Sequence, residues 1–337
     1  MSEQAEPARP ARVEWRRAVF RVAAFREIVL ILIIVISVLV LSRVNPNFLT
    51  LANFRGVLIG AVPGAIIAIG MAVLLASGGF DLSVAAVMAL CGTVGAFLLV
   101  RGIPIPVAVL LTLLLGAVIG LLNGVVVTYL NVNPLIATLG TLSIARGVAL
   151  VMTEGYNISN LPASFTALGE SGPLGLPDMV WIMLGLVVVG DLALRGTRLL
   201  RQVYYVGSNE RAARLSGIRV NGLRLFTYSL SATLAAVAGI LLAARLSTAV
   251  PTAGQGLELT VIAAAVIGGA SLAGGEGTVL GAVLGILFLN LISNALTLLG
   301  VSIFWQMVAT GVVLVVAVSL DMLVRGRAPL VSRLKGG

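Results

Sequence analysis

The sequence has no histidine, a single lysine, Lys335, and a single cysteine, Cys91. Without histidine there is no Ser-His-Asp triad, and both the usual proton shuttle and the commonest metal ligand are missing. One cysteine in an apolar run excludes a disulfide framework and a cysteine-rich zinc site. These absences remove the most familiar kinds of enzyme active site, and we expect neither a metal nor a cofactor.

The scarcity of lysine excludes a further class. A Walker A loop needs a lysine inside a glycine-rich turn between a strand and a helix, where it reaches the β- and γ-phosphates. Lys335 lies two residues from the end of the sequence. We therefore expect no P-loop, so if ATP drives this protein, another subunit must supply the ATPase.

Charge is scarce as well. Charged residues make up 10% of the 337 residues, whereas 59% are hydrophobic and the mean hydropathy is +1.11. Soluble domains carry about 25% charged residues, so the expected fold class is an all-α polytopic membrane protein. A helix needs about 20 apolar residues to cross a bilayer, and about ten segments qualify. They are Ile28–Val44, Val57–Ala76, Leu82–Val100, Pro104–Leu130, Pro134–Met152, Met179–Leu194, Leu223–Leu246, Leu259–Leu272, Val279–Leu299 and Ile303–Leu323.

The basic residues indicate the topology. They cluster near the N-terminus, in a central segment from Arg195 to Arg224, and near the C-terminus. The positive-inside rule places all three clusters in the cytoplasm, which requires even numbers of spans between them. We therefore expect cytoplasmic tails at 1–26 and 324–337 and a transmembrane domain at 27–323, interrupted by a short polar helix within 195–222. A net charge of +9 distributed in this way does not suggest nucleic-acid binding.

Glycine, in contrast, is abundant, and it interrupts the apolar pattern at 77–83 and 268–277. Unwound backbone at membrane depth is tolerated only where protein buries it or water lines it. Paired glycine interruptions in the two halves of a chain are a pointer to a transport pathway. The two breaks resemble each other loosely and suggest an internal repeat. The alternative is a pair of tight turns at the membrane edge.

Other glycines recur at intervals of four. Residues 116, 120 and 124 form one such ridge, and residues 277, 281 and 285 form another. Small residues let helix backbones approach closely in lipid, so both ridges predict helix packing.

A few polar residues lie in or beside the spans. Asp81 in the first break either caps the following helix through backbone amides or lines a substrate path. Arg146 either extends to the membrane interface or pairs with Glu154. Amides and hydroxyls both donate and accept hydrogen bonds, which suits a neutral polar solute such as a sugar. Our candidates for a translocation path are Asp81, Ser83, Asn123, Thr138, Asn290 and Asn294, with Asn133, Thr141 and Gln306 as further polar positions.

Four local motifs carry a family resemblance. They read ASGGFDLSV at 76–84, NPLIATLGTLSIARG at 133–147, VGSNERAARLSGI at 206–218, and AAVIGGASLAGGEG at 264–277. Together they make the chain resemble the permease subunits of bacterial ABC sugar importers of the ribose, xylose, arabinose and galactose type. The resemblance extends from about residue 28 to 323.

The resemblance implies a dimeric permease, of two copies or two paralogues, in the bacterial inner membrane. Its partners would be a cytosolic ABC ATPase subunit and a periplasmic or lipid-anchored sugar-binding protein. The stretch 209–218 would be the coupling helix that docks on the ATPase. The docking residues would be Asn209, Glu210, Arg211, Ala212, Ala213, Arg214, Leu215, Gly217 and Ile218.

Two positions depart from the family pattern. Ala85 stands where glycine is usual, and Glu276 stands where a basic residue is usual, so no role is carried over to Glu276. Related permeases import nucleosides or branched-chain amino acids. A secondary transporter driven by an ion gradient is the alternative from another class, although Asp81 is the only carboxylate placed to serve it.

Overall fold

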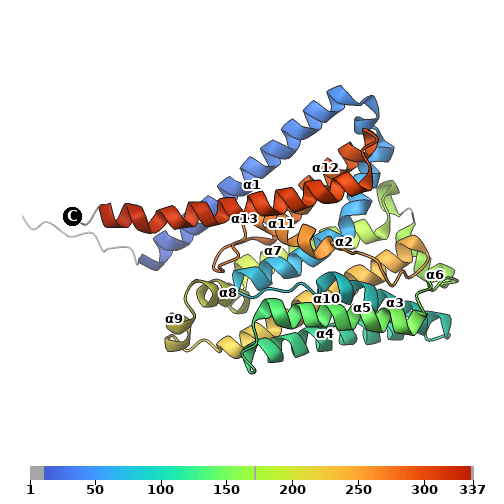
Figure 1. The fold of residues 1–337 in the computed structure, drawn as a ribbon, viewed down its shortest axis with the longest axis horizontal. Helices are drawn as coiled ribbons and strands as arrows, with labels where there is room; N and C mark the ends of the chain where they lie inside the picture. The colour runs from blue at the N-terminus through green and yellow to red at the C-terminus, as the bar shows by residue number, and fades with distance from the viewer. Residues whose placement is uncertain (1–10, 171, 335–337) are drawn as a thin grey trace, which may run out of the picture.

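The computed structural model describes residues 11–170 and 172–334, which form a bundle of helices (Figure 1). Within that range there is no β-strand, and a single isolated β-bridge joins Ile158 to Ala249. The α-helices are α1 Ala11–Val44, α2 Leu51–Ala76, α3 Val84–Val100, α4 Ile105–Thr128, α5 Pro134–Thr153, α6 Ala163–Thr166, α7 Asp178–Gly196, α8 Arg198–Ser208, α9 Glu210–Leu215, α10 Val220–Leu246, α11 Leu257–Ile267, α12 Val279–Leu298 and α13 Ile303–Leu334.

The expected all-α polytopic membrane protein is confirmed. Among the described residues, seven helices are long and apolar enough to cross a membrane, namely α1 from Phe25, α2, α4, α5, α7, α10 and α12. Three shorter apolar helices are α3, α11 and the part of α13 from Ile303 to Val316. Each overlaps one of the ten segments predicted from the sequence, although α11 ends at Ile267, short of the predicted Leu272, because the second break begins there. Helices α8 and α9 lie at one end of the bundle and α6 lies at the other, and we call these the α9 end and the α6 end (Figure 1).

Helix α2 lies at the centre of the protein. Its apolar residues point in every direction, as expected of a helix that is enclosed on all sides, and 83% of its most apolar window is buried. Helices α7, α10, α11 and α12 pack around it. The outer helices α1, α4 and α5 bury only 11%, 22% and 17% of their windows. Their exposed apolar faces are the surfaces that lipid or another apolar partner would cover.

Close helix packing explains the first glycine ridge. A Cβ at Gly116 would lie 2.8 Å from the carbonyl oxygen of Ala232, and one at Gly120 would lie 2.7 Å from the Cα of Ser229. Helices α4 and α10 therefore approach backbone to backbone, as predicted. The second ridge needs a correction. Gly281 and Gly285 pack on α11, but Gly277 has a φ of +139° and precedes α12, so it belongs to the break.

Both predicted breaks are non-helical, and they contact each other. The first spans 77–83 between α2 and α3, and the second spans 268–278 between α11 and α12. The amide of Gly275 donates a hydrogen bond of 3.0 Å to the carbonyl of Ala76 at the end of α2. Segments almost 200 residues apart in sequence are thus joined through their backbones.

The basic segment differs from the single short helix expected. It forms two helices, α8 and α9, which meet at Asn209. The backbone of Asn209 is extended, with φ −159° and ψ 99°, and its side chain accepts a hydrogen bond from the amide of Ala212. An asparagine that caps a helix favours a new start there over continuation of the preceding helix.

Candidate docking segment and solute cavity

Helix α9 is a small element held to α10 by one ion pair and one side-chain hydrogen bond. Glu210 accepts hydrogen bonds from Arg214 at 2.8 Å and from Arg224, on α10, at 2.7 Å. The hydrogen bond from Arg214, followed by the charge of Arg224, holds the pKa of Glu210 below its usual value. Arg214 also donates to Asn221 at 2.8 Å. Glu210 and Arg214 therefore orient α9, and their charges are already compensated within the chain.

Other predicted docking residues face solvent. Leu215 is 91% exposed, more than any other large hydrophobic side chain in the described part of the protein. Arg211, Ala212 and Gly217 are exposed beside it. We call Arg211, Ala212, Leu215 and Gly217 the docking face. Ala213, in contrast, is 3% exposed, and the half-buried Ile218 packs on the core, so both support α9 from within.

The backbone conformation at position 217 also favours glycine. The φ of Gly217 is +81°, in the left-handed region that favours glycine, and the residue ends the turn after α9. A Cβ built there meets nothing within 4 Å. A larger side chain at 217 would thus strain the backbone locally, and its bulk would meet only a partner.

Four of the candidate path residues form a buried hydrogen-bond network near the first break, in which the second carboxylate oxygen of Asp81 has no partner among the described residues. Asp81 Oδ1 accepts hydrogen bonds from the amide and the hydroxyl of Ser83, at 2.7 and 2.6 Å. Asn123 donates to the Ser83 hydroxyl at 3.1 Å, and Thr141 donates to Asn123. Thr138 accepts from the amide of Leu82 at 3.1 Å.

Asp81, Ser83 and Thr138 are 0% exposed, and Asn123 is 2% exposed. The network ties the first break to α4 and α5, and it lines neither of the cavities described below. Asp81 thus bonds to Ser83, the residue before α3, and to no amide within that helix.

A cavity of about 290 Å³ lies between α2, α3, α10, α11, α12 and α13. Its polar lining comes from Asn290, Gln306, Ser293, Thr260, Thr310 and Arg245. The volume is close to the lower end of ordinary small-ligand pockets, about 300 Å³. The hydroxyl of Ser293 donates to the side-chain oxygen Oε1 of Gln306 at 2.7 Å, which fixes the orientation of that side-chain amide. The lining is thus rich in uncharged groups that can both donate and accept.

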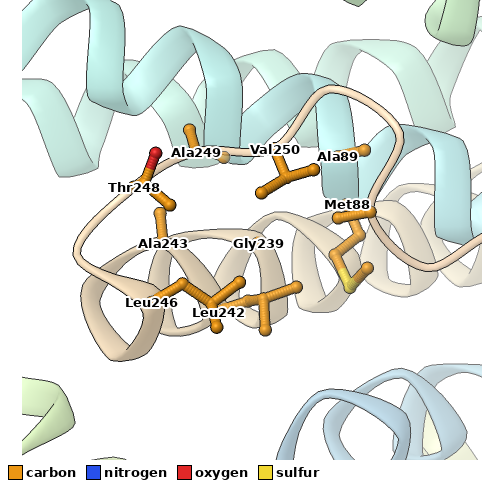
Figure 2. Close-up of a pocket in the computed structure, with 11 residues that line it drawn as sticks. Met88, Ala89, Gly239, Leu242, Ala243, Leu246, Thr248, Ala249 and Val250 are labelled. Carbon is orange, nitrogen blue, oxygen red and sulfur yellow. The ribbon is translucent and has the colours of Figure 1, made fainter. Parts of the chain in front are cut away.

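A second cavity lies nearby (Figure 2) and is far smaller, at about 10 Å³. Met88, Leu242, Leu246 and Val250 surround it, with Thr248 as the sole polar side chain in its lining. A space of this size holds at most one water molecule. It does not suit a solute.

Some polar residues lie elsewhere than expected. Asn294 exchanges two hydrogen bonds with Asn53, at 3.0 and 2.8 Å, so it joins α12 to α2. Arg146 does not pair with Glu154, because it donates to the carbonyls of Pro251 and Ala253, both at 2.9 Å. It thereby holds the loop that precedes α11.

Four lining residues of the larger cavity and one ion pair were not predicted from the sequence. The lining residues are Arg245, Thr260, Ser293 and Thr310. A single polar residue within an apolar helix gives no signal that distinguishes cavity lining from helix packing. Glu276, for which no role was expected, pairs with Arg26 at 3.0 Å. Arg26 lay in the predicted tail and is in fact part of α1.

Comparison with known proteins identifies the family. The profile described as "Branched-chain amino acid transport system / permease component" matches residues 53–318. The ribose import permease protein of Escherichia coli (strain K12) is 42% identical over 293 residues, covering 85% of this chain and 90% of that protein. The ribose import permease protein of Bacillus subtilis (strain 168) is 40% identical over 288 residues, covering 85% and 89%.

The L-arabinose transport system permease protein of Escherichia coli (strain K12) is 38% identical over 276 residues, covering 82% of this chain and 84% of that protein. No solved structure matches. The apolar helices, the two glycine-rich breaks and these similarities agree, and the chain belongs to the branched-chain amino acid transport system permease family of multi-pass membrane proteins.

Proposed function

We propose that this protein is the membrane-spanning permease subunit of a bacterial ABC importer and forms the path for a monosaccharide. A separate cytosolic ATPase drives it, and a periplasmic or lipid-anchored sugar-binding protein delivers the solute. A second copy or a paralogue completes the membrane domain. Both chain termini and the α9 end then lie on the cytoplasmic side of the inner membrane.

The observation that carries this proposal is the docking face. Leu215 is 91% exposed on a short polar helix between two spans, next to exposed Ala212 and Gly217, so the face offers an apolar contact with small neighbours that a partner could approach closely. Exposed Arg211 beside Leu215 offers a cation at the rim of the contact, where a charge mainly improves specificity. The relatives support a sugar as the solute, because they are named a ribose import permease protein and an L-arabinose transport system permease protein.

The cavity supports the class of solute. Of its polar lining residues, only Arg245 is charged, and the others are amides and hydroxyls. A sugar presents several hydroxyls, each of which can donate to and accept from such groups. A proton-coupled transporter would instead need a titratable carboxylate at this site, and the described lining residues include none.

The docking face is tested with Leu215→Glu. The substitution places a charge where the ATPase would bury an apolar side chain, so co-purification of the ATPase should fall at least tenfold. Leu174→Glu is the matched control, because Leu174 is 85% exposed in the loop before α7. Equal recovery of the ATPase with both variants would contradict the assignment of α9.

The cavity is tested with Asn290→Leu, which keeps the branched shape of the side chain and removes its polar atoms. Losing one hydrogen bond to the solute costs about 1 kcal/mol, or roughly fivefold in rate. We expect uptake of radiolabelled D-ribose or L-arabinose to fall by about that factor per folded molecule. Unchanged uptake of whichever sugar the wild type imports would exclude Asn290 from the path.

A further inference from the structure

Helix α8 reaches both glycine-rich breaks at one point. A Cβ at Gly207 would overlap the carbonyl oxygen of Ala76 and the amide nitrogen of Gly275. A Cβ at Gly274 would lie 2.9 Å from the Cα of Gly207 and 3.0 Å from the Cα of Gly78. The backbones of α8, the first break and the second break thus meet without intervening side chains. We call Gly78, Gly207, Gly274 and Gly275 the glycine junction.

A side chain of α8 strengthens the contact with the second break. The hydroxyl of Tyr204 donates a hydrogen bond of 2.7 Å to the carbonyl of Gly277. Burial raises the pKa of Tyr204, so the phenol remains a donor throughout the physiological range. Val203 and Val206, on the same helix, are 0% and 3% exposed and anchor it to the core. Helix α8 is therefore fixed along its length rather than at one point.

A partly buried charge cluster holds the end of the preceding helix, α7. Arg195, at the end of α7, pairs with Glu27 of α1 at 2.8 Å and with Asp191 at 2.6 Å. Glu27 also accepts a hydrogen bond of 2.7 Å from Thr278, which caps α12. Helix α7, which ends just before α8 begins, is thus tied through Glu27 to Thr278 at the end of the second break.

Because backbone touches backbone at the glycine junction, α8 cannot slide past the two breaks. Close-packed contacts of this kind transmit a displacement instead of absorbing it. Helix α9, by contrast, is attached mainly through α8 and through the ion pair of Glu210 with Arg224. A force on α9 therefore reaches the membrane segments by two routes, directly through α10 and through α8, and only the route through α8 leads to both breaks.

We propose that Gly207 and Tyr204 are positioning residues through which α8 passes the movement of the docked ATPase to both breaks at the glycine junction. This inference rests on the proposed function, because it assumes that a partner docks on α9. Moving both breaks together would shift α2 against α3 and α11 against α12. Since α2, α11 and α12 all line the larger cavity, the same movement would change its access.

The test measures sugar imported per ATP hydrolysed, in proteoliposomes that contain the permease, its ATPase and its binding protein, with radiolabelled D-ribose as the probe. Gly207→Ala should reduce this ratio at least tenfold while the ATPase still co-purifies. Gly222→Ala is the matched control, because Gly222 lies in the same basic segment, 195–224, at the start of α10, and a Cβ there meets nothing within 4 Å. It should leave the ratio unchanged.

A milder variant protects the test against misfolding. Tyr204→Phe removes the bond to Gly277 and keeps the ring, so it should fold and lower the ratio about threefold or more. If Gly207→Ala and Tyr204→Phe both import as much sugar per ATP as the wild type, the proposed role of Gly207 and Tyr204 is wrong. It is also wrong if uptake and hydrolysis fall only in proportion to the amount of folded protein. If the wild type binds no ATPase at all, it is the proposed function that fails.

Discussion

The charge cluster around Arg195 allows a quantitative prediction. The guanidinium compensates two carboxylates, those of Glu27 and Asp191, at 2.8 and 2.6 Å. The side chain of Glu27 is 9% exposed and that of Asp191 is 17% exposed. Arg195→Met removes the cation and keeps much of the aliphatic stem, so the packing changes little and the two anions lose their partner.

The magnitude follows from burial. Removing one partner of a buried ion pair costs about 3–5 kcal/mol, because the remaining charge is left without compensation. The pair of Arg26 with Glu276 provides an internal comparison, since those side chains are 44% and 48% exposed. Exposed pairs contribute about 0–1 kcal/mol. Arg195→Met should therefore destabilise the protein several times more than Arg26→Met.

The assay is thermal unfolding in a mild detergent, followed by the loss of the monodisperse peak in size-exclusion chromatography. Arg26→Met should unfold within a few degrees of the wild type, and Arg195→Met far below it. Glu27→Gln should fall between them, because Arg195 keeps Asp191 and the amide still accepts from Thr278. Equal midpoints for the Arg195 and Arg26 variants would refute the argument from burial.

Three further predictions concern other parts of the fold. Gly120→Val should abolish accumulation of folded protein by forcing α4 away from α10, whereas Gly140→Ala, with nothing within 4 Å of its Cβ, should have no effect on the chromatographic profile. Asp81→Asn should leave sugar uptake per folded molecule unchanged, because the amide oxygen still accepts from Ser83; a selective loss of uptake would restore Asp81 to the path. Because the pKa of Glu210 is lowered in the folded state, its stabilisation of α9 should persist at neutral pH and be lost as the pH falls through that lowered value. Glu210→Gln should accordingly speed amide hydrogen exchange across 210–218 at pH 7, and an unchanged rate would contradict this role.

The sequence was sufficient for the features that depend on composition. Apolar runs of sufficient length predicted the segments that the structure forms as helices, and glycine spacing predicted the close approach of α4 and α10 through Gly116 and Gly120. Gly-rich interruptions marked both breaks. These properties are local, since helix length, backbone clearance and unwinding depend on residues a few positions apart.

Features that depend on contacts between distant segments could not be obtained in this way. Nothing in the sequence near Asn290 shows that it lines a cavity whereas Asn294, one turn later, pairs with Asn53. The partner of Arg146 is a pair of carbonyls more than 100 residues away, not the nearby Glu154. The meeting of Gly207 with both breaks likewise requires the packing of α8 against α2.

Uptake in proteoliposomes with a controlled energy source shows whether ATP hydrolysis by a partner drives import through this chain. Vesicles containing the permease, its ATPase and its binding protein would be loaded with ATP on the side of α9 and given radiolabelled D-ribose or L-arabinose. We predict uptake that requires ATP and continues when ionophores collapse the proton and sodium gradients. Uptake that follows an ion gradient and ignores ATP would contradict this prediction and identify the protein as a secondary transporter.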